Sequence, residues 1–199
     1  TAAYYYTGKD PVFAFSCAAP FGLAANQNLA WKEQGNGRKL LDEVFDKYNF
    51  FTLSALNTGT QMGGWYRKEI KSAADLKGLK MRITGFGGTI MSRLGVVPQV
   101  IAAGDTYAAL ERGIIDAVEY TNPVDDEQMG LHKVAKYYYY PGWWEGNVQV
   151  GHLINKKKWE ELPARYKTAI QAVSAEQGQA ILNGYDAKNA AALRRLLGQ

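Results

Sequence analysis

The sequence predicts an α/β fold, because short strand patterns alternate with short helical patterns in its central part. Residues 79–84 (LKMRIT) alternate apolar and polar side chains, which is the two-residue period of a strand. The helical patterns at 88–94 and 106–112 each end at a glycine, and each is followed by a further strand pattern. Strands and helices that alternate across short links are typical of an α/β layer.

Upstream of this region the sequence predicts one helix, one strand and a loop. Apolar residues recur at helical spacing over 36–48, and the short apolar run at 50–56 predicts a buried strand. The glycine-rich stretch 57–64 predicts a loop. A one-turn helix is expected to start at Ser72 and to end at Gly78.

Downstream of this region we expect more strands and a long helix. The strand patterns that follow the two short helices cover 96–101 and 114–120. Two further strands are predicted at 136–140 and 147–155. Pro163 opens a long helical pattern that runs to the end of the chain.

The composition is that of an ordinary soluble globular protein. The chain has 199 residues, 47% hydrophobic and 21% charged, with a net charge of +4. Its basic run at 156–158 is followed at once by Trp, Glu and Glu, which indicates a solvated helix start, and we expect no nucleic acid partner. Cys17 is the single cysteine, so no internal disulfide can form.

The ends of the sequence lead us to expect a processed or truncated chain. It opens on TAAYYYTGKD and stops inside a helical pattern at RRLLGQ. No apolar run approaches the roughly 20 residues that would span a bilayer. Missing targeting signals therefore say nothing about compartment.

Arg82 lies three positions before the start of the glycine-rich stretch GFGG, and this arrangement suggests an anion site. Gly85, Gly87 and Gly88 do not keep the G-x-G-x-x-G spacing of a dinucleotide loop, so a tight turn explains them better. Arg82 itself can form a two-pronged pair with a carboxylate. The alternative is a surface arginine, or a salt bridge to a neighbouring glutamate.

Hydrolytic and zinc chemistry are disfavoured by the same sequence. His132 and His152 have no Ser, Cys or Asp nearby at the spacing of a known catalytic motif, and no Cys/His cluster fits zinc. Acidic and amide side chains at strand ends are the better candidates, namely Gln61, Glu119 and Glu145. A set of oxygen ligands favours a hard ion such as sodium, calcium or magnesium.

At this point the motifs resemble a known family. ADLKGLKMR, LGVVPQ and GDTYAALERGIIDAVEY are similar, in order and spacing, to the DctP-type solute-binding proteins of TRAP transporters. FAFSCAAPFGL, GTQMGGWYRKEI and YYYYPGWWEG most resemble the branch that binds 2-oxo acids or lactate with a metal ion. The resemblance implies a two-lobed periplasmic-binding-protein fold of type II-like α/β architecture, from which an N-terminal segment is missing.

Lobe boundaries follow as an expectation from this fold. Residues 30–118 are expected to form mainly one lobe, and residues 1–29 and 119–155 mainly the other. The helical region 156–199 is expected to brace both lobes.

The resemblance also implies roles for individual residues. Arg82 matches the arginine that clamps the substrate carboxylate, and Gln61 matches a side chain that contacts both substrate and cation. The cation, sodium or calcium, is expected to be held by Gln61, Glu119, the backbone carbonyl of Tyr120, and Glu145. The side chains expected to line the substrate pocket are Phe21, Trp143 and Trp144, with Tyr120 also beside the substrate.

One departure from the family pattern concerns the residues after Glu119. Relatives usually have Glu-Trp-Val-Gly-Pro, whereas this chain has EYTNP. Asn122 is therefore either an additional substrate contact or a residue that shapes the turn before Pro123, and we favour the turn.

The function implied by the resemblance is capture of a small acid outside the cytoplasm. We expect a periplasmic protein that binds a 2-oxo or 2-hydroxy monocarboxylate like pyruvate or lactate, without catalysis, and delivers it to the small and large TRAP membrane subunits. Relatives of the metal-using branch can dimerise, so a homodimer is also considered. The alternatives are a metal-assisted enzyme acting on a 2-oxo acid, and a remnant that no longer binds ligand.

Overall fold

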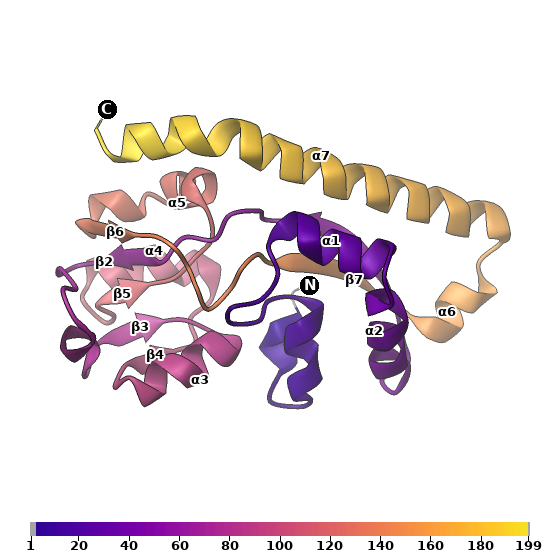
Figure 1. Ribbon diagram of the computed structural model, residues 1–199, viewed down its shortest axis with the longest axis horizontal. Helices are drawn as coiled ribbons and strands as arrows, with labels where there is room; N and C mark the ends of the chain where they lie inside the picture. The colour runs from indigo at the N-terminus through magenta and orange to yellow at the C-terminus, as the bar shows by residue number, and fades with distance from the viewer. Residues whose placement is uncertain (1–2, 199) are drawn as a thin grey trace.

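Two β-sheets lie side by side in the computed structural model, which describes residues 3–198 (Figure 1). The larger sheet has the strand order β4-β3-β5-β2-β6. Its strands are β2 (Gly64–Tyr66), β3 (Lys80–Arg82), β4 (Val97–Gln99), β5 (Ala117–Val118) and β6 (Tyr137–Tyr139). Strand β3 is parallel to β4 and β5, whereas β2 is antiparallel to β5 and β6. The smaller sheet pairs β1 (Phe50–Asn57) antiparallel with β7 (Gln149–Asn155).

Short helices flank each sheet, and one long helix runs along both (Figure 1). On the side of the larger sheet are α3 (Gly85–Arg93), α4 (Ala103–Glu111) and α5 (Pro123–Met129), with 3₁₀ turns at Ala73–Leu76 and Leu131–Lys133. On the side of the smaller sheet are α1 (Ala25–Glu33), α2 (Gly37–Asp46) and α6 (Lys156–Glu161), with 3₁₀ turns at Ala3–Tyr6 and Pro11–Ser16. Helix α7 (Ala164–Leu196) packs on β1 and on α5, so it connects the two halves.

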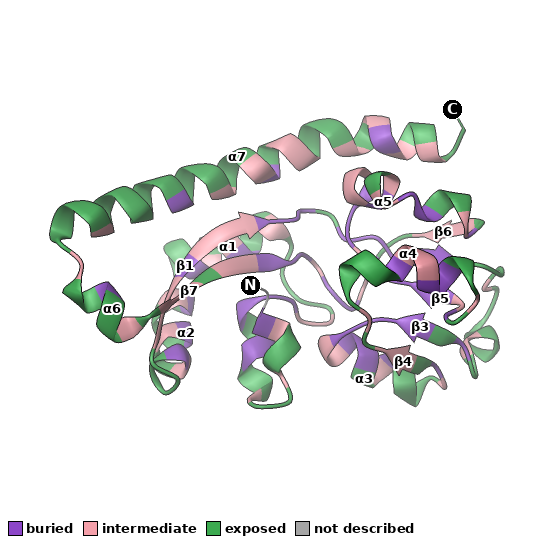
Figure 2. Ribbon diagram, turned by 180° about the vertical axis from the view of Figure 1, so that it is seen from behind, coloured by how far each residue is buried: buried purple, intermediate pink, exposed green. Residues whose placement is uncertain are grey.

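The larger sheet is covered by apolar side chains on both faces, as its alternating side chains require. Met81, Ile83 and Trp144 belong to the cluster on one face, together with Tyr66. Trp65, the neighbour of Tyr66 in β2, belongs instead to the cluster with Leu110 and Leu131 on the other face. Figure 2 shows the resulting contrast between the buried central strands and the largely exposed helix α7.

Most of the elements predicted from periodicity are confirmed. The helix predicted at 36–48 is α2, the strand at 50–56 is β1, and the long helix after Pro163 is α7. The strand predicted at 114–120 is much shorter, because only Ala117–Val118 is strand. Helices α1 and α5 were not predicted. Strand β2, which begins at the last residue of the glycine-rich stretch 57–64, was not predicted either.

The GFGG stretch is the first turn of α3 and not a separate tight turn, so that interpretation was wrong. Gly85 starts the helix with a φ of 60°, a conformation that glycine adopts without steric cost. A Cβ at Gly87 would lie 3.0 Å from Cβ of Trp144, so the glycine lets α3 pack closely on that tryptophan.

The lobe boundaries expected from the sequence stay a prediction, although the sheets cross them. Strand β1 lies in the range 30–118 but pairs with β7, and β6 lies in 119–155 but pairs with β2. Within the described residues, no helix combines the length and the apolar character needed to cross a bilayer.

Candidate functional site

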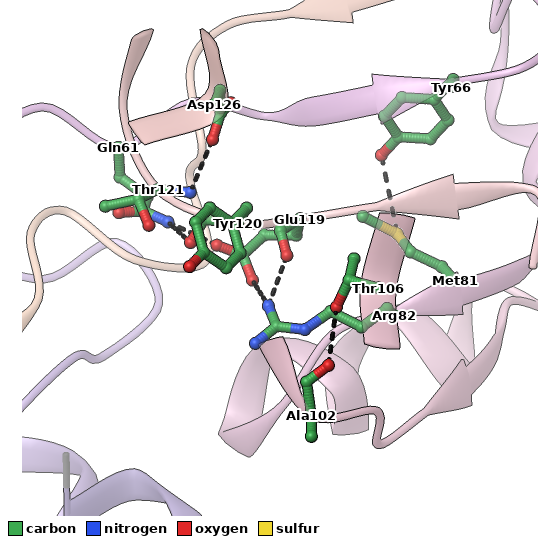
Figure 3. Close-up of polar contacts among 10 residues, drawn as sticks. All are labelled: Gln61, Tyr66, Met81, Arg82, Ala102, Thr106, Glu119, Tyr120, Thr121 and Asp126. Carbon is green, nitrogen blue, oxygen red and sulfur yellow. Dashed lines mark hydrogen bonds and ion pairs between the residues drawn. The ribbon is translucent and has the colours of Figure 1, made fainter. Parts of the chain in front are cut away.

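The centre of the site is a buried pair formed by Arg82 and Glu119 (Figure 3). Arg82 ends β3, and the parallel register sets it opposite Val118 of β5, so Glu119 follows at the same edge of the sheet. The Nη1 atom of Arg82 donates to Oε2 of Glu119 at 3.1 Å and also to its backbone carbonyl. Both side chains are almost fully buried, at 3% and 2% exposure. The salt bridge left open as an alternative for Arg82 is therefore present.

This pair leaves much of the guanidinium group without a partner. The Nε atom of Arg82 is buried and makes no hydrogen bond, and no acceptor for Nη2 is found among residues 3–198. The ring of Tyr120 lies 5.7 Å from Cζ of Arg82. Burial works to lower the pKa of Arg82, but the nearby Glu119 carboxylate raises it overall, so the group stays charged. One edge of a buried cation is thus free to receive an anion.

Gln61 joins the site from the loop before β2. Its Nε2 donates to Oε1 of Glu119 and to the carbonyl oxygen of Tyr120, the latter at 3.2 Å (Figure 3). Its own Oε1 is buried and has no hydrogen-bond partner. A half-turn of the amide would exchange the two atoms and direct the unpaired oxygen toward the other two. Three oxygens, from Gln61, Glu119 and Tyr120, would then face one point.

Three converging oxygens repel one another unless a cation lies between them, and this donor set suits a hard ion. No group of three or more His, Cys, Asp or Glu side chains that could hold a metal occurs among the described residues. A cation here therefore depends on the amide and carbonyl oxygens as well as on carboxylates. The residues present fit sodium or calcium and do not fit zinc.

Glu145 is a second buried carboxyl group close to the pair, with an exposure of 5%. Burial raises the pKa of Glu145 well above its usual value, and the negative charge of Glu119 raises it further. Burial also raises the pKa of Glu119, although Arg82 opposes this shift. Two carboxyl groups in one low-dielectric site cannot both be ionised cheaply without a second positive charge.

A cavity of about 480 Å³ opens next to this site. Gln61, Glu145, Phe21 and Trp143 line it, and it also receives Leu182 from α7. The ring of Phe21 stacks on Trp143 with 5.1 Å between centroids, and Phe21 is 81% exposed. Arg82 and Glu119 are not among the cavity's lining residues, whereas Gln61 and Glu145 are.

The two remaining predicted site residues are used by the chain itself. Trp144 does not line the cavity but packs in the core of the larger sheet. Asn122 caps α5, because its Oδ1 accepts a hydrogen bond from the backbone N–H of Asp125 at 3.1 Å. Its Nδ2 donates to the carbonyl of Thr58 at 3.2 Å. This arrangement favours the turn-shaping role of Asn122 over a substrate contact.

Tyr4 is a residue near the site that the sequence did not single out. Burial raises its pKa, and the charges of Glu145 and Glu119 raise it further, so the hydroxyl keeps its proton and can donate a hydrogen bond. The run of three tyrosines at 4–6 was visible, but it has no periodicity that would place it against α3, more than 70 residues away. Only the fold brings it there.

Comparison with known proteins gives a family match over the whole chain. The model of the family described as DctP, bacterial extracellular solute-binding protein, family 7, matches residues 1–199. The monocarboxylate 2-oxoacid-binding periplasmic protein of Nostoc sp. is 50% identical over 197 residues, which are 99% of this chain and 54% of that protein.

Two solved structures are similar to nearly the whole chain. A TRAP transporter solute binding protein from Bordetella bronchiseptica, a mixed-occupancy dimer with copurified calcium and picolinate, is 50% identical with a TM-score of 0.96. The match covers 99% of this chain and 59% of the Bordetella bronchiseptica chain. A TRAP periplasmic solute binding protein from Pseudoalteromonas atlantica, with bound sodium and pyruvate, is 39% identical with a TM-score of 0.94. It matches 100% of this chain and 60% of its own, so this chain spans little more than half the length of these relatives.

Proposed function

Because this chain belongs to the DctP family, the bacterial extracellular solute-binding proteins of family 7, we propose that it binds a small 2-oxo or 2-hydroxy monocarboxylate together with a cation. The bound acid would be delivered to the membrane permease of a TRAP transporter. The observation that carries the proposal is the free edge of Arg82, whose Nε is buried without a partner.

The free edge of Arg82 suits one carboxylate group. The Nε and Nη2 donors of a guanidinium are parallel and match the two oxygens of a carboxylate, so both can bond at once. A buried cationic donor without an acceptor is unfavourable, and an incoming carboxylate removes that cost. Phosphate is larger and carries more negative charge, which the buried carboxyl groups of Glu119 and Glu145 would oppose.

The oxygens beside Arg82 suit the cation. Glu119, the carbonyl of Tyr120 and the side-chain oxygen of Gln61 would hold it, with Glu145 as a further carboxylate nearby. The cation would supply positive charge to the 2-oxo or 2-hydroxy oxygen of the acid. Arg82 keeps the acid's carboxylate oriented, while Gln61 and Glu145 line the side of the site that faces the cavity. Sodium and calcium, each found in a similar solved structure, are the candidate ions.

We further propose that binding is not followed by a reaction. The family and the curated relative are named as binding proteins, which supports this assignment over a metal-assisted enzyme. The periplasm is the proposed compartment, in line with the name of the curated relative. The proposed partners are the small and large TRAP membrane subunits, together with a second copy of the chain in a homodimer.

Isothermal titration calorimetry of the complete gene product tests the proposal. Pyruvate and lactate are titrated with calcium, with sodium, and after removal of divalent ions by EDTA in a sodium-free buffer. We expect tight binding only when a cation is present, and weaker binding of acetate, which carries a carboxylate but no second oxygen to chelate. Nuclear magnetic resonance of the recovered acid should show no conversion. Absence of binding under every condition would refute the proposal.

A further inference from the structure

The peptide unit between Tyr120 and Thr121 has both of its polar groups engaged on opposite sides. The carbonyl oxygen of Tyr120 accepts from Nε2 of Gln61 at 3.2 Å, and the N–H of Thr121 donates to Oδ1 of Asp126 at 3.2 Å (Figure 3). In a trans peptide the C=O and N–H bonds point in opposite directions within one plane. The bond to Asp126 therefore fixes the direction in which the Tyr120 carbonyl points.

Asp126 is itself held firmly. It is fully buried, at 0% exposure, in the first turn of α5, and its backbone N–H donates to the carbonyl of Asn122 at 2.9 Å. Its second carboxylate oxygen accepts from the hydroxyl of Tyr138 at 2.7 Å. The ring of Tyr138 stacks on Trp65 at 4.1 Å between centroids, which ties the carboxylate to the core of the larger sheet.

The partners of Asp126 do not explain it as an ordinary stabilising ion pair. No Lys, Arg or His side chain forms a salt bridge with it in the part of the chain that the structure describes. A fully buried carboxylate without a cationic partner is costly. The hydrogen bonds that it accepts from the Thr121 N–H and the Tyr138 hydroxyl are therefore what holds Asp126 here. One of these two hydrogen bonds comes from the peptide unit that carries the Tyr120 carbonyl of the proposed cation site.

We propose that Asp126 is a positioning residue that orients the Tyr120 carbonyl toward the bound cation. This inference rests on the proposed function, and it assigns to Asp126 no contact with the acid or the ion. Groups that orient the ligands of a metal typically change its affinity by roughly ten- to a hundred-fold when they are removed. The affinity for the cation should therefore depend on Asp126 more strongly than the affinity for the acid.

The test compares three variants of the complete gene product by calorimetry. Calcium is titrated at saturating pyruvate, and pyruvate is titrated at saturating calcium. Asp126→Ala should weaken calcium binding by about ten- to a hundred-fold. Asp126→Asn keeps an oxygen for the Thr121 N–H, so it should stay within about threefold of wild type. Asp125→Ala is the matched control, because Asp125 lies in the same helical turn but accepts from Tyr185.

Two results would overturn the inference. One is a folded Asp126→Ala variant that binds calcium like wild type, and the other is an Asp126→Asn variant that is as weak as Asp126→Ala. If Asp126→Ala does not fold, Tyr138→Phe is the deciding variant. It removes the hydroxyl that bonds Asp126 and keeps the ring that stacks on Trp65. A severalfold loss of calcium affinity would support the inference, and unchanged affinity would refute it. Failure of wild type to bind calcium and pyruvate would instead refute the proposed function.

Discussion

Arg82 contacts Glu119 through a single nitrogen, Nη1, which bonds both the carboxylate and the backbone carbonyl of that residue. The buried Nε of the same guanidinium has no partner. The pair is therefore a half-satisfied ionic contact in which Glu119 fixes the arginine and leaves its other edge available. The predictions on the site follow from this geometry.

Replacement of Arg82 by lysine should abolish most of the affinity for the acid. Lysine keeps the positive charge beside Glu119 but cannot present two parallel donors to a carboxylate. We expect pyruvate binding to weaken by at least about 100-fold, or roughly 2.7 kcal/mol, which is within the range of about 1.5–3 kcal/mol for a hydrogen bond to a charged group. Calorimetry measures the change, and circular dichroism checks the fold.

The control for this variant is Arg93→Lys, an exposed arginine on α3. It should bind pyruvate like wild type. Unchanged binding by Arg82→Lys would show that the acid does not use the free edge.

Replacement of Gln61 by leucine should lower the affinity for the cation more than it lowers the stability of the protein. The variant removes the buried Oε1 that has no partner, and with it one of the three converging oxygens. We expect calcium affinity at saturating pyruvate to fall at least about tenfold. Gln179→Ala, on the exposed face of α7, is the control and should leave calcium affinity as it is. Equal calcium affinity in Gln61→Leu and wild type would exclude Gln61 as a ligand.

Replacement of Asn122 distinguishes a structural role of this residue from a role in substrate binding. Asn122→Ala loses the cap of α5, which should lower the free energy of unfolding by about 1–2 kcal/mol. Its affinity for pyruvate should stay within about threefold of wild type, because both amide atoms already bond within the chain. Urea denaturation measures the free energy of unfolding, and calorimetry measures the affinity for pyruvate.

The matched control for Asn122 is Asn155→Ala, which removes the cap of α6 on the other half of the molecule. It should cost similar stability without any change in binding. A tenfold or larger loss of pyruvate affinity in Asn122→Ala, but not in Asn155→Ala, would instead support the alternative interpretation of Asn122 as a substrate contact.

Lys32 gives a prediction on pH and stability away from the site. Its side chain is buried and donates to the carbonyl of Ser16 at 2.8 Å, and burial lowers the pKa of Lys32 to about 8. Below pH 8 both the folded and the unfolded chain carry the proton, so the full cost of burying the charge is present. Between pH 8 and about 10.5 the unfolded chain binds more protons than the folded one, so this cost shrinks as pH rises.

The variant Lys32→Met has no such group. Its free energy of unfolding minus that of wild type should be larger at pH 7 than at pH 10, by on the order of 3 kcal/mol, so the variant gains relative stability at the lower pH. Urea denaturation of both proteins at the two pH values measures this difference. A difference that does not change with pH would contradict the lowered pKa.

Local patterns were sufficient for much of the fold. The strand pattern at 79–84 was confirmed over Lys80–Arg82, and the helical pattern at 36–48 over Gly37–Asp46, because their side-chain periods match these elements. Helix α1 has a polar sequence, ANQNLAWKE, so its periodicity carries no signal, and it forms against α2. Helix α5 did have start signals, Asn122 as cap and Pro123 as first residue, but these were interpreted only as a turn.

The site was predicted residue by residue but not as a geometry. Gln61 and Glu119 are 58 positions apart, and they meet only because β2 and β5 are neighbours in the sheet. Strand order is a property of the whole fold, so no local pattern reveals it. The hydrogen bond between the Thr121 N–H and Asp126 is local, but it depends on the start of α5, a helix that was not predicted.

The most direct test of the central claim is a crystal structure of the complete gene product grown with calcium and pyruvate. We predict that the carboxylate of pyruvate accepts hydrogen bonds from Nε and Nη2 of Arg82. One calcium ion should lie about 2.3–2.6 Å from oxygens of Gln61, Glu119 and Tyr120. Pyruvate bound elsewhere while Nε of Arg82 stays without an acceptor would contradict the account.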